Sequence, residues 1–209
     1  MFTKKRQVKV AARDNFKYVL RSKDGKVKKL WKANLLGQLL LRLLRRKLDP
    51  VGRFSKLAAN GIRLPFVTGS YVSSLRVANT VVNVGEAGIA SRINGAGSEA
   101  AFTFIAIGTG TTSVNNTDTA LASEITSGGG ARASATASRT TTNVTNDTAT
   151  LVNTFDFTAT MAVTEAGAFN ASSAGTMLNR QTFSAINVVD GDSLEITVDV
   201  SVANSVDPV

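Results

Sequence analysis

The sequence predicts a mainly β protein in which an antiparallel β-sandwich or jelly-roll-like C-terminal domain follows a basic N-terminal arm. Three observations support this fold class. Apolar and polar residues alternate from residue 101 onward, as they do in strands with one buried face. Turns that contain glycine separate these segments. Residues 1–56 hold 18 of the 24 basic residues and three of the 15 acidic ones, which gives them a net charge of +15 and leaves −6 for the remainder.

These patterns divide the 209 residues into three parts. Residues 1–62 form the basic arm, which contains a hairpin and one or two short helices. Residues 63–100 form a connecting segment with a short helix, and residues 101–209 form the antiparallel β-sandwich domain. The length fits one domain with an appendage, because domains usually contain about 100–200 residues.

The arm contains a predicted hairpin over residues 15–32. Phe16, Tyr18 and Leu20 alternate with polar neighbours, and Asp24-Gly25 supplies residues that tolerate the positive φ of a tight turn. Almost every outward position of this hairpin is basic. The hairpin therefore presents positive charge on one face and apolar side chains on the other.

An amphipathic cationic helix is predicted after Asn34, which can cap it. Leucines recur every three to four residues from Leu36 to Leu44, and arginines occupy the opposite side. The helix ends near Asp49-Pro50.

The candidate partner-binding residues are basic side chains and leucines of the arm. They are Lys4, Lys5, Arg6, Lys9, Lys28, Lys29, Leu36, Leu40, Arg42, Leu43, Arg45, Arg46 and Lys47. A segment with this excess of positive charge is expected to bind a polyanion. We expect the leucines to pack against the body or a neighbouring subunit while the basic residues meet acidic protein. Nucleic acid is the second candidate partner, because Lys and Arg displace counterions from phosphates. A membrane surface is the least favoured.

The connecting segment contains a predicted short strand around Val72, Leu75 and Val77 and a second helix over Thr80–Ile93. Gly85 and Gly88 weaken this helix by about 1 kcal/mol each relative to alanine. The same two glycines would allow the helix to pack closely against another backbone.

The C-terminal domain contains six or seven predicted strands. The first is AFTFIAI, closed by a turn at Gly108-Thr109-Gly110, and others lie near 132–146, 148–161, 163–170 and 176–188. The last strand alternates most clearly, with one face made of Leu194, Ile196, Val198, Val200 and Val202 and the other of Glu195, Thr197, Asp199 and Ser201. One apolar and one polar face are typical of antiparallel sheets.

The composition leaves little chemistry available. Because the chain has no His and no Cys, it cannot hold a Ser-His-Asp or Cys-His nucleophile, a disulfide, or a zinc site of imidazole or thiolate ligands. Asp190-Gly191-Asp192 lacks the spacing of an EF-hand and predicts a turn before the last strand. We expect no metal, no cofactor and no enzymatic activity.

A longer pattern runs through residues 101–203. An apolar strand, Gly-x-Gly, a Thr-rich spacer and Thr-x-Leu-x-x-Glu are followed by Thr-Glu-x-Gly-x-Phe-Asn, a Leu-x-Arg-x-x-Phe strand and a closing Asp-Ser-Leu strand. The matching residues are Gly108, Gly110, Thr119, Leu121, Glu124, Thr164, Glu165, Gly167, Phe169, Asn170, Leu178, Arg180, Phe183, Asp192, Ser193 and Leu194. This pattern resembles virion structural proteins of tailed bacteriophages. The resemblance implies that these residues frame turns and strands and that none is catalytic.

The resemblance implies a non-enzymatic structural protein of a virion that is assembled in the host cytoplasm. We expect an accessory capsid protein that decorates or cements the shell. Its β-domain would form a homo-oligomer, with a trimer as the expected state, and its basic arm would bind neighbouring shell proteins. Two alternatives stay open. One is a neck, collar, baseplate or tail-fibre-anchoring protein, and the other is a nucleic-acid-packaging coat protein with its basic arm on the genome.

Overall fold

Strands provide most of the regular structure in the computed structural model, which describes residues 9–34 and 69–205. Within these residues there is one helix, α3 (Asn83–Asn94). The strands, in chain order, are β1 (Lys9–Arg21), β2 (Val27–Lys28), β3 (Leu30–Ala33), β4 (Gly69–Val72), β5 (Leu75–Ala78), β6 (Thr80–Val81), β7 (Phe104–Gly108), β8 (Ala133–Ser134), β9 (Thr136–Thr140), β10 (Thr148–Asp156), β11 (Met161–Phe169), β12 (Met177–Val188) and β13 (Ser193–Ser205).

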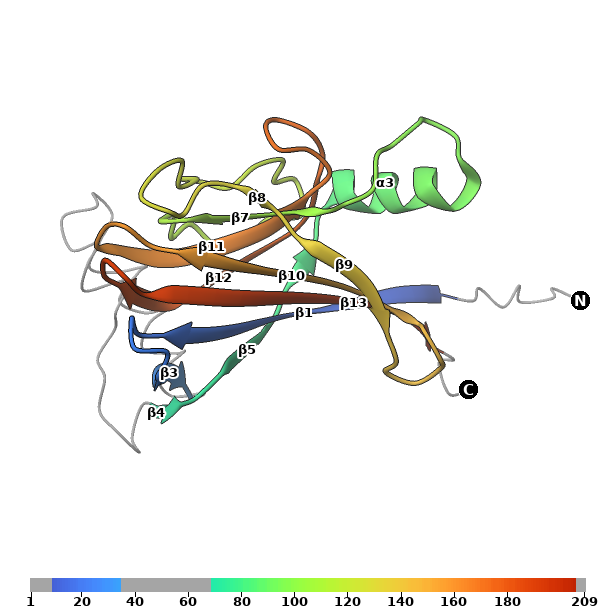
Figure 1. The fold of residues 1–209 in the computed structure, drawn as a ribbon. Helices are drawn as coiled ribbons and strands as arrows, with labels where there is room; N and C mark the ends of the chain where they lie inside the picture. The colour runs from blue at the N-terminus through green and yellow to red at the C-terminus, as the bar shows by residue number, and fades with distance from the viewer. Residues whose placement is uncertain (1–8, 35–68, 206–209) are drawn as a thin grey trace, which may run out of the picture.

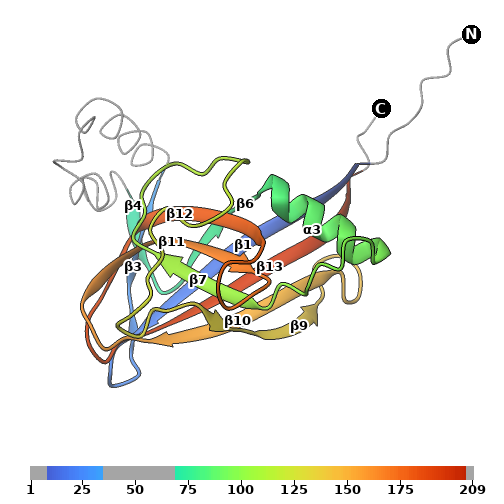
Figure 2. The same ribbon diagram turned by 90° about the horizontal axis from the view of Figure 1, so that it is seen from above.

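The strands form two large antiparallel sheets and a small third one (Figure 1). The six-stranded sheet has the order β2-β1-β13-β10-β9, and β5 also pairs with β1. The five-stranded sheet has the order β6-β12-β11-β7-β8, and β3 pairs with β4 alone. Seen from above, β7, β11 and β12 lie over β1, β10 and β13 (Figure 2). The mainly β fold is therefore confirmed, and the arrangement is consistent with a β-sandwich.

The hydrophobic core draws on both large sheets. From the six-stranded sheet, β1 contributes Phe16, Tyr18 and Leu20, which are at most 3% exposed. Strand β13 contributes Leu194, Ile196 and Val198, which are fully buried. The same cluster contains residues of the five-stranded sheet, including Ile105, Ile107, Val163, Ile186 and Val188.

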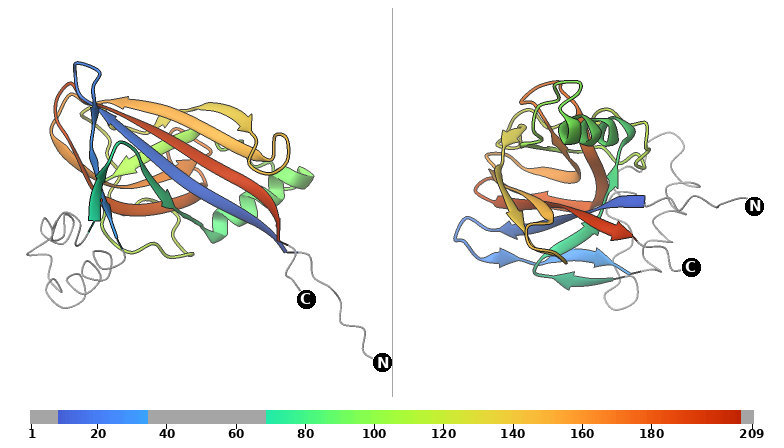
Figure 3. Two further views of the ribbon diagram at one scale, coloured as in Figure 1. Left: turned by 90° about the horizontal axis from the view of Figure 1, so that it is seen from below. Right: turned by 90° about the vertical axis from the view of Figure 1, so that its right-hand side faces the viewer.

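The structure differs from the predicted separation of a basic arm from the β-domain. Strand β1 lies inside the six-stranded sheet and runs beside β13 along its whole length, from the pair Lys9–Ser205 to the pair Arg21–Ser193 (Figure 3). The register joins Phe16 to Val198 and Tyr18 to Ile196. The physical reason is burial: the apolar alternation of the first predicted hairpin matches that of the last strand, and pairing them in this register places the apolar face of each strand on the core side of the sheet.

The predicted hairpin turn is confirmed, but the return strand splits in two. Gly25 has a φ of 78°, and Ser22 N–H donates to the Lys26 carbonyl at 2.9 Å. Strand β2 pairs with β1, whereas β3 leaves it and pairs with β4 through Ala33 and Gly69. The segment between these two paired residues is thus inserted between two strands of the fold. The predicted leucine-rich helix falls in this segment, outside the described residues.

The described part of the predicted connecting segment also contributes strands to the two large sheets. Strand β5 pairs with β1, and β6 pairs with β12. Helix α3 is confirmed, but it begins at Asn83 instead of Thr80, because Thr80 and Val81 pair with Arg180 and Asn179. The predicted domain boundary at residue 100 therefore does not separate the sheets, because strands before it lie in the same sheets as strands after it.

The strands of the C-terminal domain follow the prediction closely. Seven strands, β7 to β13, lie between residues 101 and 205. The alternation of the last strand changes at its far end, where Ser201 is 8% exposed and Val202 is 60% exposed. Strand β10 begins at Thr148, which pairs with Ser201, so the residues of β13 after Ser201 have no residue of β10 beside them.

Gly85 allows α3 to pack directly on β12. A Cβ atom at this position would lie 2.0 Å from the Leu178 carbonyl oxygen, which is far inside van der Waals contact. We therefore expect Gly85→Ala to lower the free energy of unfolding by about 1–3 kcal/mol, although alanine favours helices. Urea unfolding measures this change. The exposed Ala87→Gly serves as the control and should lose only about 1 kcal/mol, and a stabilised Gly85→Ala variant would contradict the close packing.

Tyr18 carries a buried hydroxyl without a hydrogen-bond partner among the described residues. Its ring packs on Phe183 with the centroids 4.4 Å apart. Burial raises the pKa of this tyrosine well above its ordinary value of 10.0. Its contribution to stability is therefore fully present below the unfolded-state pKa and is lost as the pH rises through the raised pKa.

We expect Tyr18→Phe to raise the free energy of unfolding by about 1 kcal/mol at neutral pH, because it removes an unsatisfied buried polar group. Unfolding curves at rising pH should show the gap between variant and parent widening above about pH 10. A Tyr18→Phe variant that is less stable than the parent would show that the hydroxyl has a partner.

Candidate functional site

Two features of the described residues could carry function: a buried ionic framework under a long loop, and a cationic surface. The framework begins at Glu165, which lies on β11 and is fully buried. Its carboxylate accepts backbone N–H bonds from Gly110 at 3.0 Å, Ala122 at 3.1 Å and Ser123 at 2.7 Å. These bonds attach the loop between β7 and β8 to the five-stranded sheet.

Arg180 on β12 neutralises this buried carboxylate. Its Nε and Nη2 atoms donate to Glu165 Oε2 at 2.9 and 2.7 Å, and Arg180 is 1% exposed. Its Nη1 donates to Asp118 at 2.7 Å, and its Nη2 also donates to the hydroxyl of Thr112 at 3.1 Å. One guanidinium thus joins two strands of the sheet to two points on the loop.

Two glycines make room for the buried carboxylate. A Cβ atom on Gly110 would lie 2.3 Å from Glu165 Oε1, and one on Gly108 would lie 2.5 Å from the same oxygen. The Thr164 hydroxyl donates to the Gly110 carbonyl at 2.8 Å. The Gly-x-Gly pattern therefore forms part of the framework, where any side chain would displace Glu165.

A second ionic contact fixes the far side of the loop. Arg132 donates from Nε and Nη2 to the two carboxylate oxygens of Glu124, at 2.9 and 2.7 Å. Its guanidinium also lies 3.7 Å from the centre of the Phe169 ring, and its Nη1 donates to the Ala174 carbonyl at 2.7 Å. The loop is thus held at both ends by an arginine. These contacts order the backbone of the loop between β7 and β8, because the charged groups bond to other groups of the chain.

The described residues contain no group of three or more carboxylate side chains placed to hold a metal ion. No helix in this part of the chain is long and apolar enough to cross a membrane.

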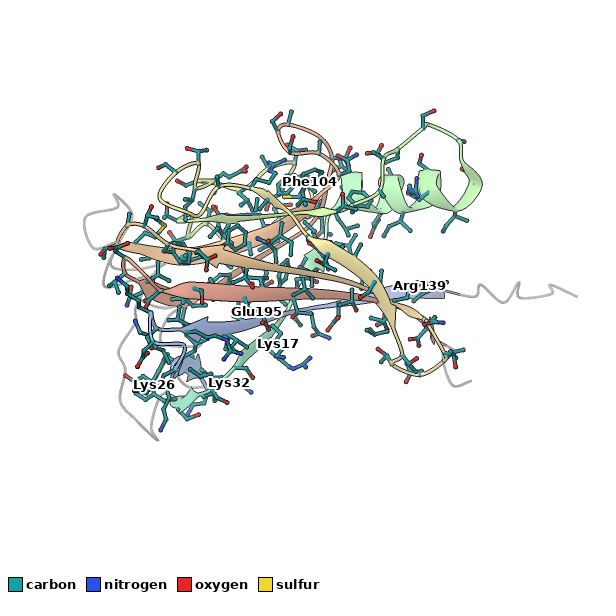
Figure 4. All side chains as sticks on the ribbon, in the orientation of Figure 1. Lys17, Lys26, Lys32, Phe104, Arg139 and Glu195 are labelled. Carbon is teal, nitrogen blue, oxygen red and sulfur yellow. The ribbon has the colours of Figure 1, made fainter. Side chains whose placement is uncertain are left out.

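The cationic surface consists of Lys17, Arg21, Lys23, Lys29, Lys32 and Arg76. Lys17 is half-buried and the other five are exposed. They come from β1, the turn after it, β3 with the residue before it, and β5. Figure 4 shows Lys17 and Lys32 in the half of the molecule that holds β1 and β3, away from Arg139 on β9. Within residues 9–34 and 69–205, none of the six forms an ion pair.

The structure places only some of the candidate partner-binding residues. Lys29 belongs to the cationic surface, and Lys9 lies in β1. Lys28 is used within the fold, because its Nζ binds both carboxylate oxygens of the buried Asp192 at 2.7 and 2.6 Å. Asp192 also accepts the Val189 N–H at 3.0 Å. The remaining candidates lie outside the described residues; these are Lys4, Lys5, Arg6, Leu36, Leu40, Arg42, Leu43, Arg45, Arg46 and Lys47.

Sequence reasoning missed five members of this surface, which are Lys17, Arg21, Lys23, Lys32 and Arg76. The signal for the first four was present, since basic residues fill the outward positions of the first hairpin. Arg76 joins them because β5 pairs with β1, and its place opposite Lys17 follows from the register alone.

Comparison with known proteins gives no assignment. No protein-family model matches the chain, and neither a curated protein nor a solved structure matches it.

Proposed function

We propose that this chain is a non-enzymatic structural protein of a bacteriophage virion, and that it serves as an accessory capsid protein that decorates or cements the shell. The observation that carries the proposal is the framework around Glu165. Residues of the virion-protein pattern, including Gly108, Gly110, Glu165 and Arg180, meet at this one place. There they stiffen a loop on a sheet, which is a structural role.

In this proposal the two sheets form a jelly-roll-like sandwich that assembles as a homo-oligomer, and cationic segments bind neighbouring shell proteins. On the folded body, the cationic surface supplies one set of basic residues for this binding. The sequence adds Arg42, Arg45, Arg46 and Lys47 in the segment between β3 and β4. When the folded body and the cationic segment both bind the shell, binding of one raises the effective concentration of the other at its own site.

Quantified protein composition of purified particles tests the proposal. Hundreds of copies of the chain per particle would support shell decoration. A small multiple of three or six would place the chain at the neck or tail instead, and its absence from particles would contradict a virion role.

The cationic segment is tested by substitution, because β1 belongs to the fold and an N-terminal deletion would remove a strand of the sheet. We expect the variant with Arg42, Arg45, Arg46 and Lys47 all changed to Gln to lose occupancy on particles. The double variant Arg92→Gln/Arg139→Gln, which changes exposed arginines of α3 and β9, should keep it. Equal occupancy of both variants would exclude a role for the cationic segment.

A further inference from the structure

In the described part of the chain, strand β9 leaves one edge of the six-stranded sheet without a neighbouring strand. It is the last strand in the order of this sheet and pairs only with β10 (Figure 2). All five of its residues are exposed, whereas the end strands β2, β6 and β8 contain two residues each. The backbone N–H and C=O groups of such an edge can pair with a further strand.

Strand β9 carries little of the protection that proteins usually give to an edge, which is lysine, proline or a bulge. Its sequence is Thr-Ala-Ser-Arg-Thr, so Arg139 is its one charged residue. Its pairing with β10 is regular from the pair Thr148–Thr140 to the pair Val152–Thr136. The edge is therefore unbroken by a bulge, and a single arginine is its only charge.

A chain of hydroxyl groups crosses the outer face of the sheet and ends at this edge. Thr150 on β10 donates its one hydroxyl proton to Asp199 at 2.9 Å, because a carboxylate only accepts. The hydroxyl oxygens of Thr140 and Thr150 lie 2.8 Å apart, so Thr140 is the donor in this second bond. Because a hydroxyl oxygen has two lone pairs, the oxygen of Thr140 remains an acceptor for a donor one strand further out.

We propose that β9 pairs antiparallel with β9 of a second copy of the chain, about a two-fold axis through Ser138 that is perpendicular to the sheet. The inference rests on the proposed function, which includes a homo-oligomer, and it names the strand that forms the contact. Thr136 of the second copy then lies opposite Thr140 and brings a hydroxyl to its free acceptor. Cross-strand pairs of threonine and serine stabilise antiparallel sheets, and a contact of one strand with itself gives the two-fold symmetry that is commonest among oligomers.

Overlap and charge select this register among the two-fold pairings. An axis through Ala137 would leave Arg139 and Thr140 without a partner in β9 of the second copy. An axis through Arg139 would place two like charges directly opposite each other, which destabilises a sheet. The axis through Ser138 pairs every residue of β9 and sets Arg139 against the small Ala137. The pairing therefore uses the backbone of Arg139 and does not depend on its charge.

The contact is suited to chains that are already held close together. A single five-residue strand buries less surface than a stable dimer of free chains needs. On a shell, neighbouring copies have a high effective concentration, and a weak contact between them is then sufficient. This contact joins two copies, instead of the three expected from the resemblance to virion proteins.

Oxidative cross-linking of the full chain tests the register, since the chain has no cysteine of its own. Directly opposed residues of antiparallel strands have Cα atoms about 4.5–5.5 Å apart, which a disulfide spans. The two copies of Thr136 would lie about 13 Å apart along the strands, which is too far. We expect Ser138→Cys to form a disulfide-linked dimer at least about tenfold faster than the matched control Thr136→Cys. Equal rates, or a faster control, would overturn the inference.

Sedimentation equilibrium over a range of concentrations measures the affinity of the contact. Ser138→Lys sets two lysines opposite each other across the axis and should weaken dimerisation about fivefold. The control Ala87→Lys adds the same charge to the exposed side of α3 and should change the affinity less than about twofold. Equal affinities of the two variants, or a parent chain that stays monomeric or forms a trimer, would also overturn the inference.

The composition of purified particles separates this inference from the proposed function. If the chain is present on particles and Ser138→Cys shows no preference over Thr136→Cys, the pairing of β9 is wrong while the virion role stands. If the disulfide forms selectively and the chain is absent from particles, the virion role is wrong while the pairing stands.

Discussion

Replacing Arg180 with methionine is expected to lower the free energy of unfolding by about 3–5 kcal/mol, because it leaves the carboxylate of Glu165 buried without its counter-charge. Glu165 is fully buried and lies 2.7 Å from the guanidinium. The same change also removes the bonds from Arg180 to Asp118 and Thr112, so the loop after β7 should loosen with it. Urea unfolding by linear extrapolation measures the loss.

Two further variants identify the cause of this loss. Arg139→Met removes an exposed arginine and should change stability by less than about 0.5 kcal/mol. Adding Glu165→Gln to Arg180→Met should recover part of the loss, because glutamine still accepts backbone N–H bonds but carries no charge. An Arg180→Met variant within about 1 kcal/mol of the parent would show that the buried pair does not hold the loop.

Phe16→Ala is expected to cost about 3–5 kcal/mol, because it empties a fully buried aromatic site in the core. Phe16 stacks beside Tyr18 with the ring centroids 5.9 Å apart, and its pairing partner Val198 is also fully buried. Thermal or urea unfolding measures the change. The neighbouring Asn15→Ala alters an exposed side chain of the same strand and should cost less than about 0.5 kcal/mol. Equal stability of both variants would mean that this stretch is an arm independent of the core.

Local patterns predicted much of the fold. The alternation of apolar residues placed β10 to β13, and the pair Gly85 and Gly88 predicted a close helix contact that the structure confirms at Gly85. The partner of each strand could not be predicted in the same way. An alternating segment shows which face is buried but not which strand lies beside it, so Phe16, Tyr18 and Leu20 suggested a local hairpin. Their longest pairing is with β13, far along the chain.

In the candidate site, the pairing partners of charged residues could not be predicted from the sequence either. Glu165 and Arg180 stand in apolar strands, and charged residues are almost never fully buried unless they are paired. Composition and spacing do not show that the two pair, and only their places in the virion-protein pattern singled them out. Lys17 and Arg76 are likewise brought together by the pairing of β1 with β5.

Native-state hydrogen exchange of the β1 amides tests most directly whether the cationic N-terminal region is part of the folded body. Strand β1 pairs with β13 through thirteen residue pairs, so the two strands should open together. We expect the amides of Phe16 to Leu20 that bond to β13 to exchange with the same opening free energy as those of Leu194 to Val198. Exchange of the β1 amides at the rate of an unstructured chain, while β13 stays protected, would contradict the account.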